Sequence, residues 1–460
     1  MNLKKLLHLA GAGGLVLGMS LFGTSAMARE AQAVPGTFRS AIIVANPGAV
    51  EADVTLNFVK PDGTTALAPA MAFKVAAGAS SQVYVPSVPG LADGRYSVVI
   101  DSNQNVVAIA NLTSDNPSTS TSYNGISQND VGKQFNMPSV YKNYFGYTSS
   151  LVIQNAAGAV ANATITYKRS GSPDVTETRP IPGNASVTVD QGAAALADGF
   201  IGSAVVTSDQ DVAAIFLVSG PSQLSSGRGA KSGAPIAYAP VIYDQYFGYV
   251  TNVFVQNLDT TATNVTIEYF DSRTGASVGS EQATIQPGAS TTFFQFDTGR
   301  GPAVPRPGFN GSAVVRSTDN KNIIAVANIN NPRQGYLEAY NGFASSGATQ
   351  RTSCPAIMKN YHNYNTSLTV QNVGTAATNL TIQYVGPGGQ VASSVTIGGL
   401  QPNATAFRYS PALTENLPDG FLGSAVVASS GEPIVAVVNE LFGTGSEAGD
   451  QLFTYACSNS

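Results

Sequence analysis

Few side chains in this 460-residue sequence could do acid–base, nucleophilic or metal chemistry. It contains two histidines and two cysteines. His8 lies in an apolar N-terminal stretch, and His362 takes a position that Phe145 and Phe247 fill in two similar segments. A Ser–His–Asp triad, a Cys–His pair or a histidine-rich zinc site needs more than one isolated histidine. We therefore expect no enzyme of these classes, and we interpret His362 as a surface substitution.

The two cysteines, Cys354 and Cys457, are placed for a disulfide. An exported chain favours disulfide formation, and the pair flanks the last quarter of the sequence. Cys354 begins the first expected strand of that quarter and Cys457 ends its last. If these strands are neighbours, their Cα atoms can reach the roughly 4.4–6.8 Å separation that a disulfide needs. We therefore expect a disulfide that holds the last strand of the last repeat in place. The sequence has no CxxC motif or Cys/His cluster that would indicate a metal or redox role.

Acidic residues fall mostly in turns, where their side chains stabilise the backbone locally. The examples are Asp93, Asp198 and Asp419 in "DG" pairs, Asp209 and Asp211 in "SDQD", and Asp319 in "STDN". A glycosidase-type carboxylate pair has no support in this pattern. We expect no cofactor. The alternative is a weak calcium site at Asp209, Asp211 and Asp319, because clustered Asp and Asn oxygens are hard ligands.

The first 28 residues have the pattern of a cleaved export signal. Lys4 and Lys5 precede an apolar run, and Ala26-Met27-Ala28 forms a small-residue cleavage site, with a second at Ala31-Gln32-Ala33. The run is interrupted by glycine and too short to span a membrane comfortably, and nothing later is long and apolar enough. We expect a secreted or cell-surface protein whose mature chain has no membrane span.

The mild negative charge argues against a nucleic-acid partner, and we expect none. The net charge is −5, and removal of Lys4 and Lys5 with the export signal makes it about −7. Binding to phosphates needs clustered lysine and arginine. Only 11% of the residues are charged and 43% are hydrophobic, with 47 glycines, which indicates a folded, turn-rich chain.

Three landmarks recur four times in the same order. The first ends at Asn46, Asn155, Asn257 and Asn372, as in "KNYHNYNTSLTVQN", with spacings of 109, 102 and 115 residues. The second is a segment such as "LPDGFLGSAVV", and the third is an apolar run such as "IVAVVN". A period near 100 residues is that of a self-sufficient domain, and propeller blades and helical solenoids have shorter periods. We therefore expect four independent domains in a row with no shared core.

The fourth repeat shows seven or eight short strands and no amphipathic helix. "TSLTVQN" and "NLTIQYV" alternate apolar and polar residues, "GSAVVAS" and "IVAVVNE" are apolar on both faces, and "SGEP" between the last two predicts a hairpin turn. These features predict an all-β protein of immunoglobulin-like or fibronectin-like β-sandwiches. The expected modules are residues 34–136, 137–238, 239–352 and 353–460, after a signal peptide at 1–28.

A tyrosine-rich phrase joins the first and second expected strands of repeats two to four. Its recurring positions are Tyr144, Tyr147, Tyr246, Tyr249, Tyr361 and Tyr364. A ring with a polar tip suits a surface that is apolar on one side and wet on the other. We favour packing at module junctions for these rings. The alternative is an aromatic platform for sugars.

The combination "KNY…TSL.VQN…LPDGF.GSAVV…I.AVVN" resembles repeats in predicted secreted and cell-surface proteins of bacteria, especially those with filamentous growth or unusual envelopes. The resemblance covers the mature chain in four copies. It implies an extracellular structural or adhesive role and transfers no catalytic residue. Leu217 replaces the usual asparagine in repeat two, and repeat one lacks the tyrosine-rich phrase.

Together these patterns favour a non-enzymatic structural protein: a surface-layer or filament building block, or an adhesive spacer. Its partners would be other copies of itself or other components of the cell envelope. Repetition could turn weak contacts into avidity. The alternative function is an array of carbohydrate-binding modules that uses the recurring tyrosines on glycans.

Overall fold

The computed structural model describes residues 37–295, 304–305, 308–410, 415–443 and 449–459. The expected signal peptide, residues 1–28, lies outside this part. The described chain is all-β, with two short 3-10 turns, η1 (Val85–Ser87) and η2 (Ser345–Gly347). No helix in the described ranges is long and apolar enough to cross a membrane. The strands fall into four groups, which we call repeats 1 to 4.

Repeat 1 has seven strands and repeat 2 has seven. Those of repeat 1 are β1 (Phe38–Ala45), β2 (Ala52–Val59), β3 (Met71–Val75), β4 (Ser80–Tyr84), β5 (Ser97–Ser102), β6 (Val107–Asp115) and β7 (Ser118–Asn124). Those of repeat 2 are β8 (Gly132–Lys142), β9 (Thr148–Asn155), β10 (Ala161–Lys168), β11 (Val175–Ile181), β12 (Ser186–Asp190), β13 (Phe200–Ser219) and β14 (Leu224–Arg228).

Repeats 3 and 4 each have nine strands in the described ranges. Those of repeat 3 are β15 (Ile236–Tyr246), β16 (Tyr249–Asn257), β17 (Thr263–Asp271), β18 (Ser277–Ile285), β19 (Ser290–Phe294), β20 (Phe309–Ser317), β21 (Ile323–Asn331), β22 (Tyr336–Asn341) and β23 (Phe343–Ala344). Those of repeat 4 are β24 (Arg351–Lys359), β25 (Tyr364–Asn372), β26 (Thr378–Val385), β27 (Val391–Leu400), β28 (Thr405–Tyr409), β29 (Phe421–Ser429), β30 (Ile434–Phe442), β31 (Leu452–Ala456) and β32 (Ser458–Asn459).

Two antiparallel layers recur in every repeat. One is a four-stranded layer, ordered β4-β1-β6-β7 in repeat 1 and β28-β25-β30-β31 in repeat 4. The other is β3-β2-β5 in repeat 1 and β27-β26-β29-β24-β32 in repeat 4. Apolar residues of both layers pack together, as Val54 of β2 and Val44 of β1 do in repeat 1. The period-2 alternation of these strands follows from one buried face.

The asparagine that ends each first landmark ties its repeat together. Asn46 is fully buried, and its Nδ2 donates to the Val50 and Val75 carbonyl oxygens at 2.7 and 3.1 Å, while its Oδ1 accepts from Gly48 N–H at 3.0 Å. Asn155, Asn257 and Asn372 repeat this set of bonds. Each buried asparagine thus joins the turn that follows its strand to the end of a strand in the other layer of its repeat.

The "SGEP" segment is not a hairpin turn, so that prediction is wrong. It joins β29, which pairs with β24 and β26, to β30, which pairs with β25 and β31 in the other layer. In repeat 2 the same crossing has no break at all, because β13 runs continuously from Phe200 to Ser219. Its first half pairs with β8 and β10 and its second half with β9 and β14.

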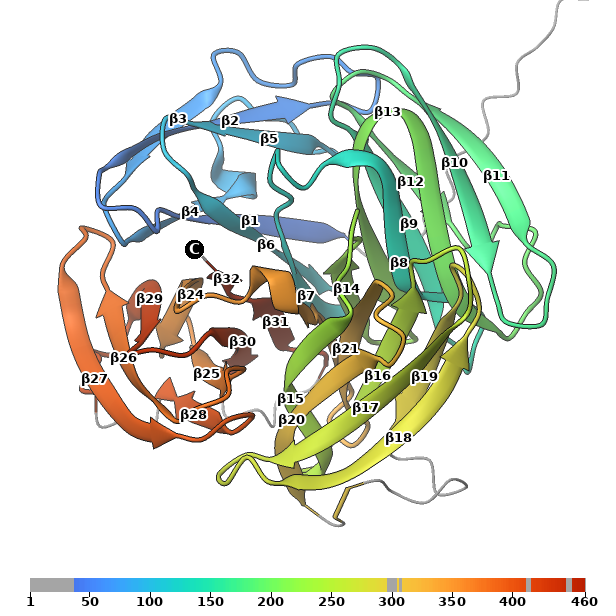
Figure 1. Cartoon of the computed structure of the whole chain (residues 1–460). Coiled ribbons are helices and arrows are strands. Elements are labelled where there is room, and N and C mark those ends of the chain that lie inside the picture. The colour runs from blue at the N-terminus through green and yellow to red at the C-terminus, as the bar shows by residue number, and fades with distance from the viewer. Residues whose placement is uncertain (1–36, 296–303, 306–307, 411–414, 444–448, 460) are drawn as a thin grey trace, which may run out of the picture. The chain divides into compact units, whose positions relative to one another are not determined.

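The four repeats are not independent domains in a row, and that expectation is wrong. The innermost strands β7, β14, β22 and β31 contact one another in cyclic order, so the repeats close into a ring (Figure 1). Hydrophobic cores cross the boundaries: Phe254 of repeat 3 packs into the core of repeat 2, and Ile43 of repeat 1 packs into that of repeat 4. All these strands belong to one compact unit, Gln32–Ser460.

Candidate interaction surfaces

Three hairpin tips carry the tyrosine-rich phrase. The tip between β8 and β9 is a two-residue turn closed by Tyr144 and Tyr147, whose backbone N–H and C=O groups bond each other at 2.9 and 3.0 Å. The two turn residues, Phe145 and Gly146, have φ of 50° and 85°. Positive φ at both positions is the type I′ pattern that matches the twist of a hairpin, and it normally selects asparagine or glycine.

The first turn position is an exposed aromatic ring in two of these tips. Phe145 is 84% exposed and Phe247, at φ 50° in the equivalent tip of repeat 3, is 81% exposed. His362 takes the position in repeat 4 at φ 47°. A bulky side chain in the left-handed region is uncommon and costs about 1 kcal/mol or more. Phe145 and Phe247 pack edge-to-face on Tyr144 and Tyr246, with ring centroids 4.8 and 4.7 Å apart, which offsets part of that cost. Most of each phenylalanine ring nevertheless remains exposed to solvent.

The six recurring tyrosines lie in these hairpins and are partly buried. Tyr246 stacks on Tyr243 with ring centroids 5.5 Å apart, and Tyr144 lies 6.0 Å from Tyr141. Tyr364 packs against Phe442 and Phe453. The six positions thus hold rings that close the ends of their own repeats. We retain the sugar-platform hypothesis for one of them, Tyr361, for the reason that follows.

Tyr361 borders a shallow hollow of about 380 Å³ in repeat 4. The other residues around the hollow are Pro387, Pro418, Asp419, Gly420, Phe421 and Leu422. The Asp419 carboxylate is mostly exposed and lies 3.9 Å from Lys359 Nζ. The aromatic ring can stack on an apolar sugar face, and the carboxylate beside it can accept hydrogen bonds from sugar hydroxyl groups.

Buried acidic groups gather where the inner strands meet. The Glu338 carboxyl group accepts hydrogen bonds from Thr121 Oγ1 and from the Ser122 and Ala339 N–H groups, each at 3.0 Å. Asp450 accepts from the Leu224 N–H at 2.9 Å and the Leu337 N–H at 3.2 Å. Burial raises the pKa of both carboxyl groups. The two side chains thus bond backbone N–H groups of other repeats.

Two asparagine side chains also bond backbone groups of a neighbouring repeat. Asn341 donates to the Arg228 carbonyl oxygen at 2.7 Å and accepts from the Arg228 N–H at 3.0 Å. Asn124 bonds the two backbone groups of Ala456 in the same way. Each inner strand is an edge strand of its own layer, and unpaired edges are aggregation-prone. Here side chains of neighbouring repeats satisfy part of each edge.

The calcium candidates accept hydrogen bonds within the protein. Asp209 takes two bonds from Asn162, one from the backbone and one from the side chain, both at 2.8 Å. Asp319 accepts from Thr263 and from Ser317 and pairs with Lys321 at 2.9 Å. Asp211 is exposed. Hydrogen bonds from Thr263 and Lys321 lower the pKa of Asp319. In the described ranges no three His, Cys, Asp or Glu residues are grouped to hold a metal ion.

The structure brings Cys354 and Cys457 together as a disulfide with a Cα–Cα distance of 4.6 Å. Both residues are buried beside Tyr455 in the core of repeat 4. The bond ties β24 to the segment between β31 and β32, at the end of the last repeat.

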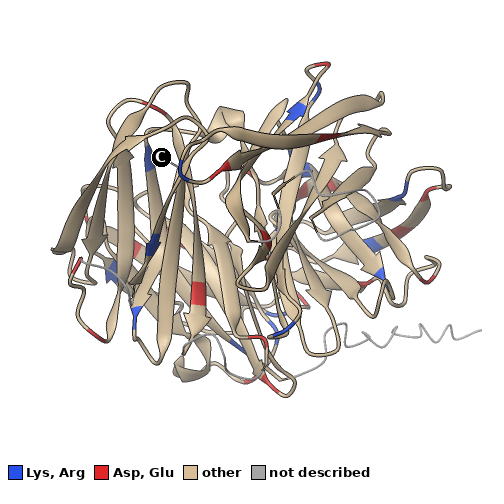
Figure 2. Ribbon diagram, turned by 90° about the horizontal axis from the view of Figure 1, so that it is seen from below, with Lys and Arg blue, Asp and Glu red and all other residues tan. Residues whose placement is uncertain are grey.

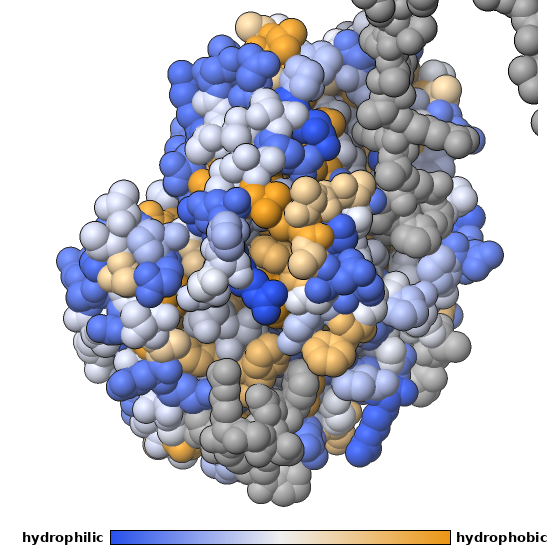
Figure 3. Space-filling view, turned by 90° about the vertical axis from the view of Figure 1, so that its right-hand side faces the viewer, coloured by the Kyte–Doolittle hydropathy of each residue, from blue (hydrophilic) through white to orange (hydrophobic). Residues whose placement is uncertain are grey.

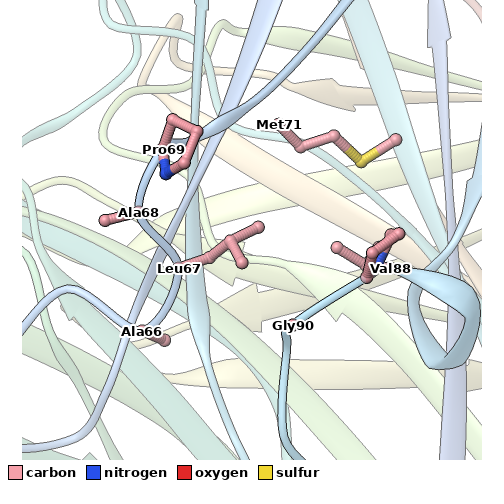
Figure 4. A pocket seen from close by; sticks show the side chains of 8 residues that line it. Ala66, Leu67, Ala68, Pro69, Met71, Val88 and Gly90 are labelled. Carbon is pink, nitrogen blue, oxygen red and sulfur yellow. The ribbon is translucent and has the colours of Figure 1, made fainter.

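In the ribbon view of Figure 2, lysine, arginine, aspartate and glutamate residues are scattered over the strands and loops, with both signs interspersed. On the face shown in Figure 3, hydrophobic residues form patches between hydrophilic ones. A hollow of about 440 Å³ in repeat 1 is lined only by apolar residues (Figure 4). They are Ala66, Leu67, Ala68, Pro69, Met71, Val88, Pro89 and Gly90. No polar side chain lines this hollow to orient a substrate.

Comparisons with known proteins find similar sequences and structures but assign no function to this chain. Residues 16–192 match the model of a family of unknown function, DUF5719. No curated protein matches. Among solved structures, the chain is similar to Thermotoga maritima 1070, with 20% identity over 21% of this chain and 92% of that one and a TM-score of 0.20. It is also similar to a tetra-tandem repeat in the extending region of a large adhesion protein, with 12% identity over 92% and 94% of the two chains and a TM-score of 0.12.

Proposed function

We propose that this protein is a non-enzymatic extracellular structural protein, a building block that assembles through its aromatic hairpin tips. In this proposal the four repeats are immunoglobulin-like β-sandwiches, the chain is secreted, and its partners are other copies of itself in a surface layer or filament. The observation that carries it is the pair Phe145 and Phe247, the two most exposed large hydrophobic side chains of the described chain, both in the left-handed region.

Strained backbone and exposed aromatic rings together favour an interaction role. Conformations that cost free energy tend to cluster at functional sites. An exposed phenylalanine gains about 1.5–3 kcal/mol when a partner buries it. Because the tip recurs in consecutive repeats of one molecule, two tips of that molecule can bind partners at once, and the molecule gains avidity. The closed ring removes support for the spacer version of this function, since the repeats do not extend the chain.

The test compares assembly of residues 29–460 with that of a Phe145→Asn/Phe247→Asn variant, by sedimentation velocity and negative-stain electron microscopy over rising concentration. Asparagine tolerates positive φ, so the tips keep their turn. A matched control is Val50→Asn/Val160→Asn, which replaces two exposed valines, 62% and 56% accessible, away from the tips. We expect ordered assembly for the wild type and the control and loss of assembly for the tip variant. Separate particles of the wild type at every concentration would contradict the proposal.

The second candidate is glycan binding at the hollow beside Tyr361. The specific observation is the pairing of this ring with the Asp419 carboxylate at one hollow. This function predicts saturable binding on a glycan array, with loss of binding in Tyr361→Ala and Asp419→Ala variants. Assembly through the tips predicts indifference to soluble sugars.

A further inference from the structure

Edge strands end both layers of every repeat. The four-stranded layers end on β4, β12, β19 and β28, and the other layers end on β3, β11, β18 and β27. Within the described residues, each of the last four pairs only with the strand that precedes it in the chain. An unpaired edge is a template for a strand of another molecule, and native proteins block it with charges, proline or short length.

All of these edges except β27 carry such a blocking feature. β4, β12, β19 and β28 have only five residues each. β3 is equally short and also carries Lys74. β11 contains Glu177, Arg179 and Pro180, and β18 contains Glu281. Repeat 4 is therefore the one repeat whose second layer ends on a long strand without protection.

The sequence of β27, VASSVTIGGL, is ten residues long and contains no charged residue and no proline. Val395 takes the position that Glu177 and Glu281 fill in repeats 2 and 3, each opposite an isoleucine of the neighbouring strand. Val391 is 51% exposed, and the segment from there to Ile397 alternates between the two faces of the layer. Segments of about six or seven residues with β-branched side chains, no charge and no proline pair readily with copies of themselves.

All the residues around this edge in sequence are described. Residues 308–410 are continuous, so β26, β27, β28 and the turns that join them are in place. The nearest undescribed residues in sequence, 411–414, follow β28, which belongs to the four-stranded layer. In Figure 1 no described strand lies beyond β27 at the left of the drawing. The fold of repeat 4 itself therefore leaves this edge free.

We propose that the edge of β27 pairs with the same edge of a second copy of this chain, antiparallel and about a two-fold axis at Ser394. This register is the one that pairs every residue from Val391 to Ile397. The opposed pairs are Val391 with Ile397, Ala392 with Thr396, Ser393 with Val395, and Ser394 with its own copy.

The composition of the edge favours a second copy over a strand of another protein. In this register no like charges meet, and β-branched side chains face each other or small residues, which stabilises an antiparallel pair. A foreign strand is selected by pockets or charges that recognise its alternate side chains. β27 offers neither a charge nor an aromatic ring for such selection. Its own sequence, by contrast, matches it in every pair.

The pair would extend the layer β27-β26-β29-β24-β32 across two molecules. A two-fold contact uses the same patch on both copies and therefore stops at two. Ordered assembly through Phe145 and Phe247 is a separate contact that can continue beyond a pair. The proposal does not depend on the aromatic tips, and either contact can exist without the other.

The Phe145→Asn/Phe247→Asn variant of residues 29–460 isolates this contact, because its tips no longer carry the phenylalanine rings. Sedimentation velocity from about 1 µM to about 500 µM follows its mass, since a contact along one strand edge is small and its affinity modest. We expect single molecules at the lowest concentration and a reversible pair at the highest. Single molecules throughout would overturn the proposal and leave the edge to a strand of another protein. That result would not bear on the tips, which ordered assembly of the wild type tests.

Ser394→Lys, added to the tip variant, would place two ammonium groups face to face at the two-fold axis. It should weaken pairing about tenfold or more, because like charges directly opposite destabilise an antiparallel pair. The matched control is Ser280→Lys, at the exposed serine with the same register position on β18, which should leave pairing unchanged. Unchanged pairing of Ser394→Lys, or equal weakening by both changes, would overturn the proposal.

A mixture of Ser394→Lys and Ser394→Glu, both in the tip variant, tests the partner and the register together. Opposite charges would meet at the axis, so the mixture should pair at least about tenfold more tightly than either variant alone. Ser394 is exposed, so both variants should melt at the temperature of the tip variant, which shows that they fold. A mixture that pairs no better than its components would overturn the two-fold register at Ser394.

Discussion

The carboxyl group of Glu338, in repeat 3, accepts a hydrogen bond from the backbone N–H of Ser122, in repeat 1, at 3.0 Å. The two residues are far apart in sequence and lie in repeats that are not neighbours in the ring. Asp450 makes the corresponding link from repeat 4 to Leu224 of repeat 2. The ring is thus held together by side chains that bond strand edges across its centre.

Glu338→Gln should destabilise the ring. The amide nitrogen of glutamine cannot accept a hydrogen bond, so at least one of the buried donors on Thr121, Ser122 and Ala339 would lose its partner. We expect a loss of about 3 kcal/mol in the free energy of unfolding, measured by urea denaturation. The matched control is Glu51→Gln, at an exposed carboxylate paired with Lys74, for which the change should be within about 0.5 kcal/mol. Similar effects of both changes would show that Glu338 does not link the repeats.

Stability should fall as the pH rises, through Glu440. Burial raises the pKa of Glu440 to about 8, against the opposing hydrogen bond from Asn111. Because the folded pKa lies above the unfolded one, this contribution is fully present below pH ~4.5 and is lost as the pH rises toward 8. Between pH 5 and pH 9 the wild type should lose about 4 kcal/mol that Glu440→Gln retains, since glutamine mimics the neutral acid.

Melting curves of both proteins over that pH range measure the difference. Glu51→Gln serves as the control, with a pH profile that follows the wild type. Parallel profiles of wild type and Glu440→Gln would mean that Glu440 is ionised in the folded ring at neutral pH.

Gly202→Ala should be severely destabilising. A Cβ on Gly202 would collide with the carbonyl oxygen of Lys168 and with the Phe200 ring, and Gly311 and Gly423 have the same surroundings. The backbone carbonyl cannot move without breaking the β10–β13 ladder, so we expect a loss of about 3 kcal/mol or more. Gly158→Ala is the control in the same repeat, since nothing lies within 4 Å of its Cβ position. Circular dichroism melts that shift equally for the two variants would contradict the close approach.

Replacement of Phe145 and Phe247 by asparagine should abolish ordered assembly without unfolding the protein. At Phe145 and Phe247 asparagine suits φ near 50° better than phenylalanine does, and this relief of strain offsets the loss of the edge-to-face contacts with Tyr144 and Tyr246. Each Phe→Asn change should therefore alter the free energy of unfolding by less than about 1 kcal/mol. Assembly should be lost in the same protein. A tip variant that is less stable than the wild type by clearly more than about 1 kcal/mol would show that the rings mainly stabilise the fold, and the argument for an interaction role would fail.

The repeat and its strands follow from the sequence, because both rest on local patterns. "TSLTVQN" alternates and becomes β25, and the recurring asparagine marks the same turn four times. The exposure of Phe145 and Phe247 at the hairpin tips could not be predicted, since phenylalanine usually marks a core.

The ring could not be predicted from local patterns, because its inner strands are polar. β7 (STSTSYN) and β14 (LSSGR) have the composition of solvent-exposed edges, yet Thr121 and Ser226 are buried against each other at 2.7 Å. One signal was present: "GSAVVAS" and "IVAVVNE" are apolar on both faces, which a two-layer domain standing alone does not require. In the ring, the neighbouring repeat covers the second face of β30, as the burial of Val437 in the core of repeat 3 shows.

Small-angle X-ray scattering of residues 29–460 in dilute solution tests the closed ring most directly. A compact unit of this length should have a radius of gyration of about 22 Å. Four separate domains in a row would give roughly twice that value. A radius near the first value, unchanged on dilution, is the result that the ring predicts. A radius near the second, with the scattering of a rod, would contradict it.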